Sequence, residues 1–190
     1  MFPKQLSAFF IAIVLYGLSV TAAGADQLAG CTTISTGKIG KNGEVGIEKL
    51  QCPQDSKFSE SKAMSSSGDA MNVCDHRCDT TCDDETRDTI KYTADDCDTL
   101  YRGLWFASQN QEQGNQITIG AGQAFKAEFN TCVVVVLNNY RSGQLEYCRN
   151  SLGTVTRSIG QCPFGGRCIP GGQNTGEAWK IVGYGQPRKW

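Results

Sequence analysis

The chain has 190 residues, with 18 lysines and arginines against 19 aspartates and glutamates, which gives a formal net charge of −1 at pH 7. This balance argues against a nucleic-acid partner, because proteins that bind nucleic acids usually concentrate positive charge on one face. The length suits one domain with an N-terminal extension.

Residues 1–25 have the pattern of a secretory signal peptide: Lys4 stands near the start, residues 6–20 are mostly apolar, and small residues close the segment. We expect cleavage after Ala25, with cleavage after Ala22 as the alternative. The apolar part is too short to span a membrane, and no later stretch is long enough. These features predict a secreted, extracellular product without stable membrane insertion.

All ten cysteines follow this segment, and an even number in an exported chain predicts five disulfides with no free thiol. They are Cys31, Cys52, Cys74, Cys78, Cys82, Cys97, Cys132, Cys148, Cys162 and Cys168. Their spacing does not determine the pairing. The spacing of three of these cysteines and His76 over 74–82 would allow zinc, but thiols outside the cytosol are far more often oxidised.

Residues 26–90 are expected to form a cysteine-containing, loop-rich N-terminal extension. A turn at 41–43 predicts a short hairpin closed near Cys31 and Cys52, and the polar stretch 55–69 reads as a flexible connector. The three cysteines within 74–82 are spaced by four residues, which would place them on one stripe of a helix. We expect each of them to bond to a different element and so to staple the extension to the core.

Residues 91–190 are expected to form the core domain. Thr93 and Asp96 have the form of a capping box, and the apolar spacing behind them predicts a helix over 94–108. The stripe consists of Cys97, Leu100, Tyr101, Leu104 and Trp105. Period-two alternation predicts strands over 117–119 and 125–129, separated by a bend at 120–122. The continuous apolar run 131–137 predicts a strand buried on both faces.

The C-terminal part predicts a second helix over 144–159, with Gly160 as its C-cap. Its apolar positions are Leu145, Cys148, Leu152, Val155 and Ile159. A small disulfide-closed loop over 162–168 and a last strand over 178–184 complete the chain. Together the elements predict an α+β fold: a disulfide-rich α/β sandwich with two helices on one face of a mostly antiparallel sheet, in which Cys132 ties the central strand to a helix carrying Cys97 or Cys148.

Within residues 92–132, the sequence resembles small cysteine-rich secreted proteins of fungi, including the Ecp-type necrosis-inducing effectors. The matching positions are Asp96, Cys97, Leu100, Trp105, Thr131 and Cys132. The predicted layout of helices and strands is also similar to the α/β sandwiches of fungal killer toxins. Asn130 and Thr131 stand where that effector family usually has a glycine before its second cysteine. The resemblance implies a secreted effector or toxin-like protein and supplies no catalytic residues.

No catalytic, cofactor-binding or metal-binding residues are expected. His76 is the only histidine, and Arg77 occupies the place where small secreted phospholipases need an aspartate. The acidic candidates for a glycosidase are better explained as groups that favour helix starts and solvent. They are Asp83, Asp84, Glu85, Asp95, Asp96 and Asp98. Glu128 and Lys126 suit cross-strand pairing on a wet sheet face.

A recognition surface is the remaining candidate for a functional site. Trp105 and Trp179 are expected to pack in the core, whereas four other side chains are expected off the core or on the 162–168 loop. These are Phe106, Phe164, Arg167 and Tyr184. We expect a secreted, non-enzymatic, monomeric effector or toxin-like protein that binds a host or microbial protein or glycan. The alternatives are a small secreted hydrolase and a structural cell-surface protein.

Overall fold

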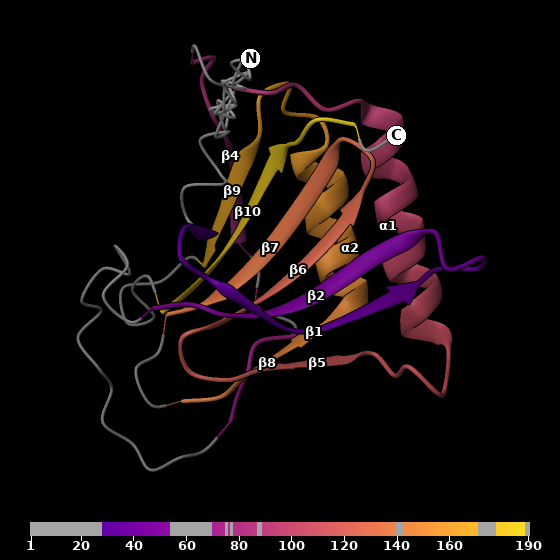
Figure 1. Cartoon of the computed structure of the whole chain (residues 1–190), viewed down its shortest axis with the longest axis vertical. Helices are drawn as coiled ribbons and strands as arrows, with labels where there is room; N and C mark the ends of the chain where they lie inside the picture. Colours follow the sequence, from indigo (N-terminus) through magenta and orange to yellow (C-terminus); the bar gives the residue numbers. More distant parts are fainter. Residues whose placement is uncertain are drawn as a thin grey trace, which may run out of the picture.

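A seven-stranded antiparallel sheet with two helices against one face forms the centre of the molecule, as the computed structural model shows (Figure 1). The structure describes residues 28–53, 70–74, 76, 78–86, 89–139, 143–170 and 178–188. The expected signal peptide and the expected connector over 55–69 lie outside these residues.

The main sheet has the strand order β1-β2-β6-β7-β10-β9-β4. These strands are β1 (Thr32–Ile39), β2 (Val45–Gln51), β6 (Gln123–Phe129), β7 (Cys132–Asn138), β10 (Trp179–Gly185), β9 (Gly166–Pro170) and β4 (Cys78–Cys82). The helices are α1 (Ala94–Gln109) and α2 (Arg149–Ile159), and a smaller mixed sheet contains β3 (Met71–Asn72), β8 (Leu145–Cys148) and β5 (Gln116–Ile119). The predicted α+β class, with two helices packed on a mostly antiparallel sheet, is confirmed.

Strand β7 is buried along its whole length, as the apolar run predicts. Val134 and Val136 belong to the core cluster beneath the helices. Val133, Val135 and Leu137 belong to a second apolar cluster on the opposite face. This division follows from the strand geometry, because successive side chains point to opposite faces of a sheet. The two neighbours of β7 are β6 and β10, so the strand lies at the centre of the sheet.

The prediction for α1 is confirmed, including its start. Thr93 is the N-cap, and its side-chain oxygen accepts a hydrogen bond from the Asp96 backbone N–H at 3.3 Å. The predicted position of Trp105 in the core is wrong, because Trp105 is exposed. The buried face of α1 instead includes Gly103 and Ala107, two small residues that let the helix approach the sheet closely.

The predicted start of the second helix is wrong. Residues of β8 form a strand, and α2 begins at Arg149. Leu145 and Tyr147 are buried while Glu146 between them is half-buried, which is the alternation of a strand. Gly160 is the C-cap, as predicted, but its φ of −59° is not left-handed. A Cβ at Gly160 would lie 2.9 Å from Cys97 Cβ, so the glycine allows the end of α2 to approach α1.

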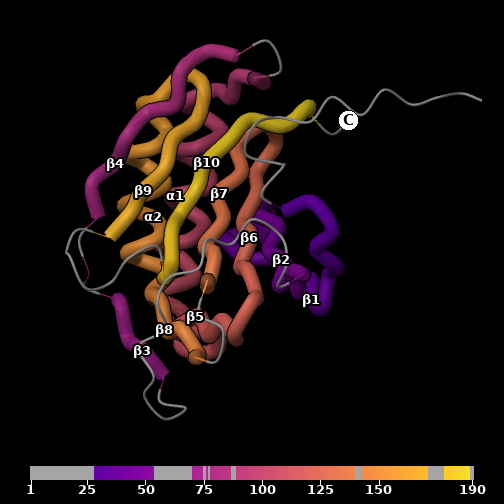
Figure 2. Tube along the Cα trace, turned by 90° about the vertical axis from the view of Figure 1, so that its left-hand side faces the viewer, coloured from indigo at the N-terminus to yellow at the C-terminus, as the bar shows by residue number. Residues whose placement is uncertain are grey.

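Three strands of the main sheet come from residues 26–90, the expected loop-rich extension. The predicted hairpin is confirmed as β1–β2, and it joins the sheet because β2 pairs with β6. The helical arrangement considered for the cysteines of 74–82 does not hold for Cys78–Cys82, which is strand β4 and pairs with β9. A four-residue spacing puts side chains on one side of a strand as well as of a helix, which explains the error. Figure 2 shows β1 and β4 at opposite ends of the sheet.

All ten cysteines form disulfides, as predicted. The pairs are Cys31–Cys52, Cys74–Cys148, Cys78–Cys168, Cys82–Cys162 and Cys97–Cys132. The Cys97–Cys132 pair confirms that the central strand is tied to a helix. The prediction that a disulfide closes the loop over 162–168 is wrong, because Cys162 and Cys168 each bond to a cysteine of β4 instead of to one another. Five disulfides indicate a protein of an oxidising compartment.

Neither α1 nor α2 has the length and apolar character needed to cross a membrane, and the remainder of the described chain holds no helix that does.

Candidate functional site

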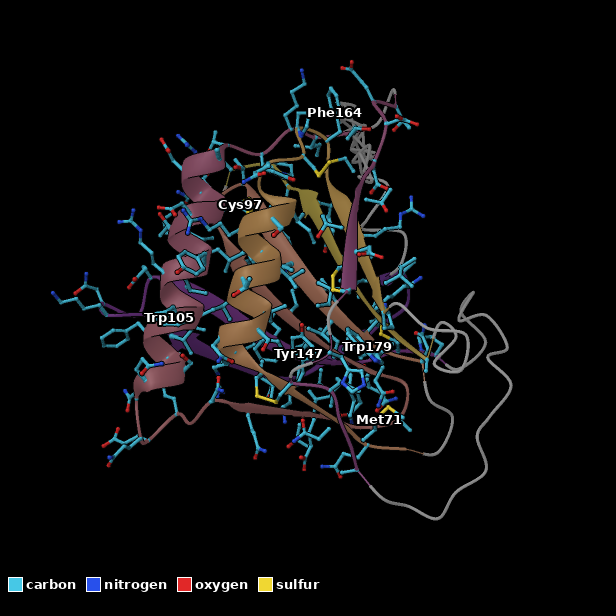
Figure 3. The ribbon with its side chains drawn as sticks, turned by 180° about the vertical axis from the view of Figure 1, so that it is seen from behind. Met71, Cys97, Trp105, Tyr147, Phe164 and Trp179 are labelled. Carbon is cyan, nitrogen blue, oxygen red and sulfur yellow. A yellow bond between two sulfur atoms is a disulfide. The ribbon has the colours of Figure 1, made fainter. Side chains whose placement is uncertain are left out.

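The outer side of α1 carries two consecutive exposed aromatic residues. Trp105 is 45% exposed and Phe106 is 41% exposed, which places both among the most exposed large apolar side chains of the described residues. Figure 3 labels Trp105 in the C-terminal half of α1. Exposed aromatic side chains are common anchors of recognition surfaces.

Two neighbours extend this surface toward α2. The rings of Tyr101 and Trp105 have centroids 6.4 Å apart and are tilted by 41°. The guanidinium carbon of Arg157, on α2, lies 5.5 Å from the centroid of the Tyr101 ring. We call Tyr101, Trp105, Phe106 and Arg157 the α1 aromatic surface. Its chemistry suits a flat partner that stacks on aromatic rings or accepts hydrogen bonds from arginine.

A second exposed cluster surrounds the loop between α2 and β9. Lys91 Nζ lies 4.7 Å from the centroid of the Phe164 ring, and Arg167 pairs with Asp83 at 2.5 Å between Nη2 and Oδ1. The Asp83 backbone N–H also donates to the Gly165 carbonyl at 2.9 Å. The disulfides from β4 hold both ends of this loop, so Phe164 stands on a rigid support.

The four expected recognition residues do not form one surface. Phe106 lies on α1, whereas Phe164 and Arg167 lie together around the second cluster; Figure 3 shows Phe164 and Trp105 far apart. The expectation that Tyr184 lies off the core is wrong, because this side chain is only 7% exposed. Tyr184 stands opposite Val133 in the sheet, and both side chains belong to the apolar cluster on the face away from the helices. Burial, with the nearby charges of Glu128 and Glu48, raises the pKa of its phenol.

The carboxylates considered as catalytic candidates have structural contacts in several cases. Asp83 pairs with Arg167, and Asp98 Oδ2 lies 2.6 Å from Arg102 Nη2. Asp96 is buried and accepts hydrogen bonds from the turn between β6 and β7.

Lys126 Nζ lies 3.4 Å from Glu48 Oε1 on the neighbouring strand β2, which confirms the expected cross-strand pairing for Lys126. It also lies 2.7 Å from Glu128 Oε2 on its own strand β6.

His76 is exposed, and the three cysteines near it are bonded to other cysteines. The preference for disulfides over a zinc site in this segment is therefore confirmed for these thiols. Across the described ranges, no group of three or more histidine, cysteine, aspartate or glutamate side chains is arranged to hold a metal ion.

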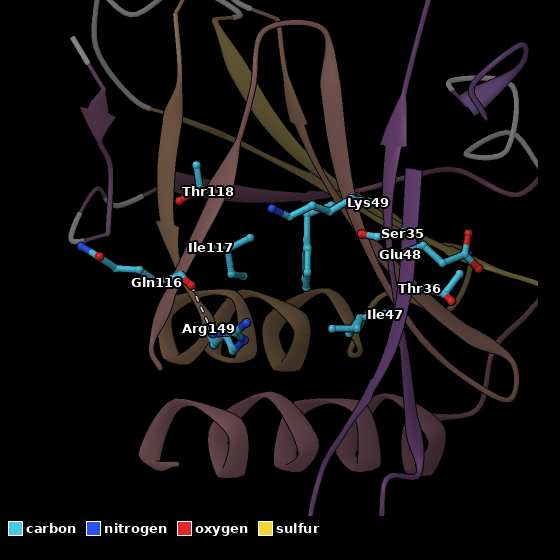
Figure 4. Close-up of a pocket in the computed structure, with 10 residues that line it drawn as sticks. Ser35, Thr36, Ile47, Glu48, Lys49, Gln116, Ile117, Thr118 and Arg149 are labelled. Carbon is cyan, nitrogen blue, oxygen red and sulfur yellow. Dashed lines mark hydrogen bonds between the residues drawn. The ribbon is translucent and has the colours of Figure 1, made fainter. Parts of the chain in front are cut away.

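A small pocket lies between the β1–β2 hairpin and β5 (Figure 4), with a volume of about 230 Å³. Its lining comes from five elements, and includes Ser35 and Thr36 of β1, Ile47, Glu48 and Lys49 of β2, Gln116, Ile117 and Thr118 of β5, Phe125 of β6 and Arg149 of α2. The sequence analysis did not anticipate this pocket, because no local motif links residues so far apart in the chain.

No protein family, no curated protein and no solved structure matches this chain. The structure itself shows a cysteine-rich, disulfide-bonded α+β protein.

Proposed function

We propose that the chain is a secreted, non-enzymatic effector or toxin-like protein that binds a host or competitor component through the α1 aromatic surface. The carrying observation is the exposure of Trp105 and Phe106 on a helix whose opposite face is fixed to the sheet. The Cys97–Cys132 disulfide and the hydrogen bonds of Asp96 hold that opposite face. A rigid support lowers the entropy that a binding surface loses when a partner docks.

Two further features support this proposal. The signal-peptide pattern and the five disulfides suit a protein that works outside the cytosol. The resemblance of residues 92–132 to secreted fungal effectors covers all of α1 and points to the same class of protein. Asp96 is committed to hydrogen bonds inside the fold, and Asp83 and Asp98 each pair with an arginine at the surface, which supports binding over hydrolysis.

In the test, purified, oxidised, fluorescently labelled protein is incubated with host tissue and, separately, with competing microbes. We expect retention on one of these surfaces together with a cell response. The Trp105→Ala/Phe106→Ala double variant should lose most of the retention, because aromatic anchors often dominate a binding interface. Phe164→Ala is the matched control, since it removes an aromatic ring from the other cluster.

The outcomes separate the proposal from its alternatives. Loss of binding only with Phe164→Ala would keep the effector function and move its surface to the loop between α2 and β9. No retention and no response with either target, combined with release of sugar from polysaccharides, would replace the proposal with a secreted glycosidase.

A further inference from the structure

The pocket between β2 and β5 has the size of a site for a small molecule. Its volume of about 230 Å³ lies below the roughly 300–1,000 Å³ typical of pockets for drug-sized ligands. Ile47, Ile117 and Phe125 contribute apolar lining. Ser35 and Thr118 contribute hydroxyl groups, so the pocket combines apolar walls with hydrogen-bonding groups.

Lys49 brings a positive charge to this pocket. In the sheet it stands opposite Ser35 of β1 and Phe125 of β6, so these three side chains share the face that lines the pocket. Figure 4 shows Lys49 extending from β2 toward β5. Among the described residues, no carboxylate lies within ion-pair distance of its ammonium group.

Arg149 brings a second positive charge. Its Nη1 donates hydrogen bonds to the carbonyls of Gln113 at 2.7 Å, Gly114, and Gln116 at 3.1 Å. These neutral carbonyls orient the guanidinium without cancelling its charge. Nε of Arg149 is buried and has no hydrogen-bond partner within the described part of the chain. Burial also lowers the pKa of this guanidinium, as expected for a cation that is poorly solvated.

The one carboxylate that lines the pocket is directed elsewhere. Glu48 Oε1 lies 3.4 Å from Lys126 Nζ, and Glu48 stands opposite Lys126 in the sheet. Because Glu48 and Lys49 are consecutive strand residues, their side chains point to opposite faces. The charges of Lys49 and Arg149 therefore remain available to an anion.

We propose that this pocket binds a small organic carboxylate with an apolar body. Lys49 and Arg149 hold the carboxylate, since charge-assisted hydrogen bonds to a carboxylate are the strongest that these side chains make. Ile47, Ile117 and Phe125 cover the apolar body of the ligand. The pocket shares no residue with the α1 aromatic surface, so this inference does not depend on the proposed effector function.

The test titrates the purified, oxidised protein with benzoate, with the neutral analogue benzamide and with inorganic phosphate, and measures heat and amide chemical shifts. We expect saturable benzoate binding about tenfold or more tighter than benzamide binding, because benzamide lacks the charge. Shift changes should centre on β2 and β5. Absence of benzoate binding, equal affinity for benzamide, or equal affinity for phosphate would each overturn the proposal.

Two variants connect the binding to this pocket. Lys49→Gln should weaken benzoate binding about tenfold, whereas Lys41→Gln, in the exposed turn between β1 and β2, should leave it unchanged. Thr118→Tyr places a larger side chain at an exposed position of β5 and should block the pocket while suiting a strand. Unchanged circular dichroism establishes that each variant is folded. Benzoate binding that persists at full strength in either folded pocket variant would contradict the assignment.

Discussion

At the scale of single residues, Asp96 connects the start of α1 to the turn between β6 and β7. Its carboxylate accepts hydrogen bonds from the Asn130 side chain at 3.1 Å and from the Thr131 hydroxyl at 2.5 Å and backbone N–H at 3.2 Å. Asn130 has a φ of 46°, a left-handed conformation that asparagine tolerates better than most residues. One acidic side chain thus fixes a tight hairpin turn against a helix.

The electrostatics of Asp96 follow from these contacts. Burial opposes ionisation of the carboxyl, but the hydrogen bonds from Thr131, Thr93 and Asn130 outweigh it, and the pKa falls below the ordinary 3.8. Arg188 Nη2, at 3.9 Å from Oδ2, also favours the charged form. Because the pKa is lower in the folded state, ionised Asp96 stabilises the fold above the ordinary pKa, and this contribution is lost as pH falls through the folded pKa.

We therefore predict that Asp96→Asn lowers the free energy of unfolding at neutral pH by about 1–3 kcal/mol, the usual effect of losing charge-assisted hydrogen bonds. The difference from the parent protein should shrink as pH falls below 3.8, since the parent carboxyl then becomes protonated. Denaturant unfolding over a pH series measures both effects. Asp95→Asn is the control, because Asp95 lies in the same first turn of α1 as Asp96 but is exposed. A difference in unfolding free energy that stays constant with pH would contradict the role assigned to Asp96.

At the scale of elements, the close approach of α1 to β2 depends on a glycine inside the helix. A Cβ at Gly103 would lie 2.5 Å from Val45 Cγ2, and both residues are buried. Glycine normally weakens a helix interior by about 1 kcal/mol relative to alanine. The close packing of the N-terminal hairpin against α1 offsets this cost, and that packing requires a residue without a side chain at position 103.

We predict that Gly103→Ala destabilises the protein by about 1–3 kcal/mol despite its better helix propensity, because the added methyl group overpacks the contact with Val45. Gly153→Ala on α2 is the matched control, since its nearest neighbour would be Tyr101 Cδ2 at 3.3 Å and the ring can adjust. Thermal unfolding compares the two.

Combining Gly103→Ala with Val45→Ala should give less destabilisation than the sum of the single changes, because the second change removes the clash. Strict additivity would indicate that Val45 is not the obstacle.

At the scale of the whole molecule, the disulfides join segments that are far apart in the chain. Four of the five pairs have sequence separations from 35 to 90 residues. They connect β4 to β9 and its preceding loop, the segment before β4 to β8, and α1 to β7. Closing such long loops restricts the unfolded chain, which is one source of disulfide stabilisation.

We predict that the unreduced protein has a mass about ten hydrogens below that of its fully reduced form, and that native alkylation labels no cysteine. Replacing Cys97 and Cys132 by alanine should lower the free energy of unfolding by about 2–5 kcal/mol. Mass spectrometry and denaturant unfolding provide the measurements. Labelling of several thiols in the native protein would contradict the pairing described above.

Local sequence patterns were sufficient for elements with a single clear period. The helix after Thr93, the two strands on either side of 120–122 and the buried run of β7 all follow from patterns within a few residues, and Phe106 is exposed as expected. Trp105 was misplaced because the buried face of α1 is set by its contact with β2, which favours Gly103 over a large ring. The exposure of Tyr184 was predicted wrongly because the side chains that bury it form the apolar cluster on the face of the sheet away from the helices.

The sequence by itself thus determined the α+β class, the helix α1, the strands β5, β6, β7 and β10, and the oxidation of every cysteine. These depend on short-range periodicity and on cysteine number. Only the tertiary structure decided which cysteines pair, that β4 and β8 are strands, and that the N-terminal hairpin joins the main sheet. The pocket that contains Lys49 and Arg149 also depends on the tertiary structure, because its lining comes from five elements that only long-range packing brings together.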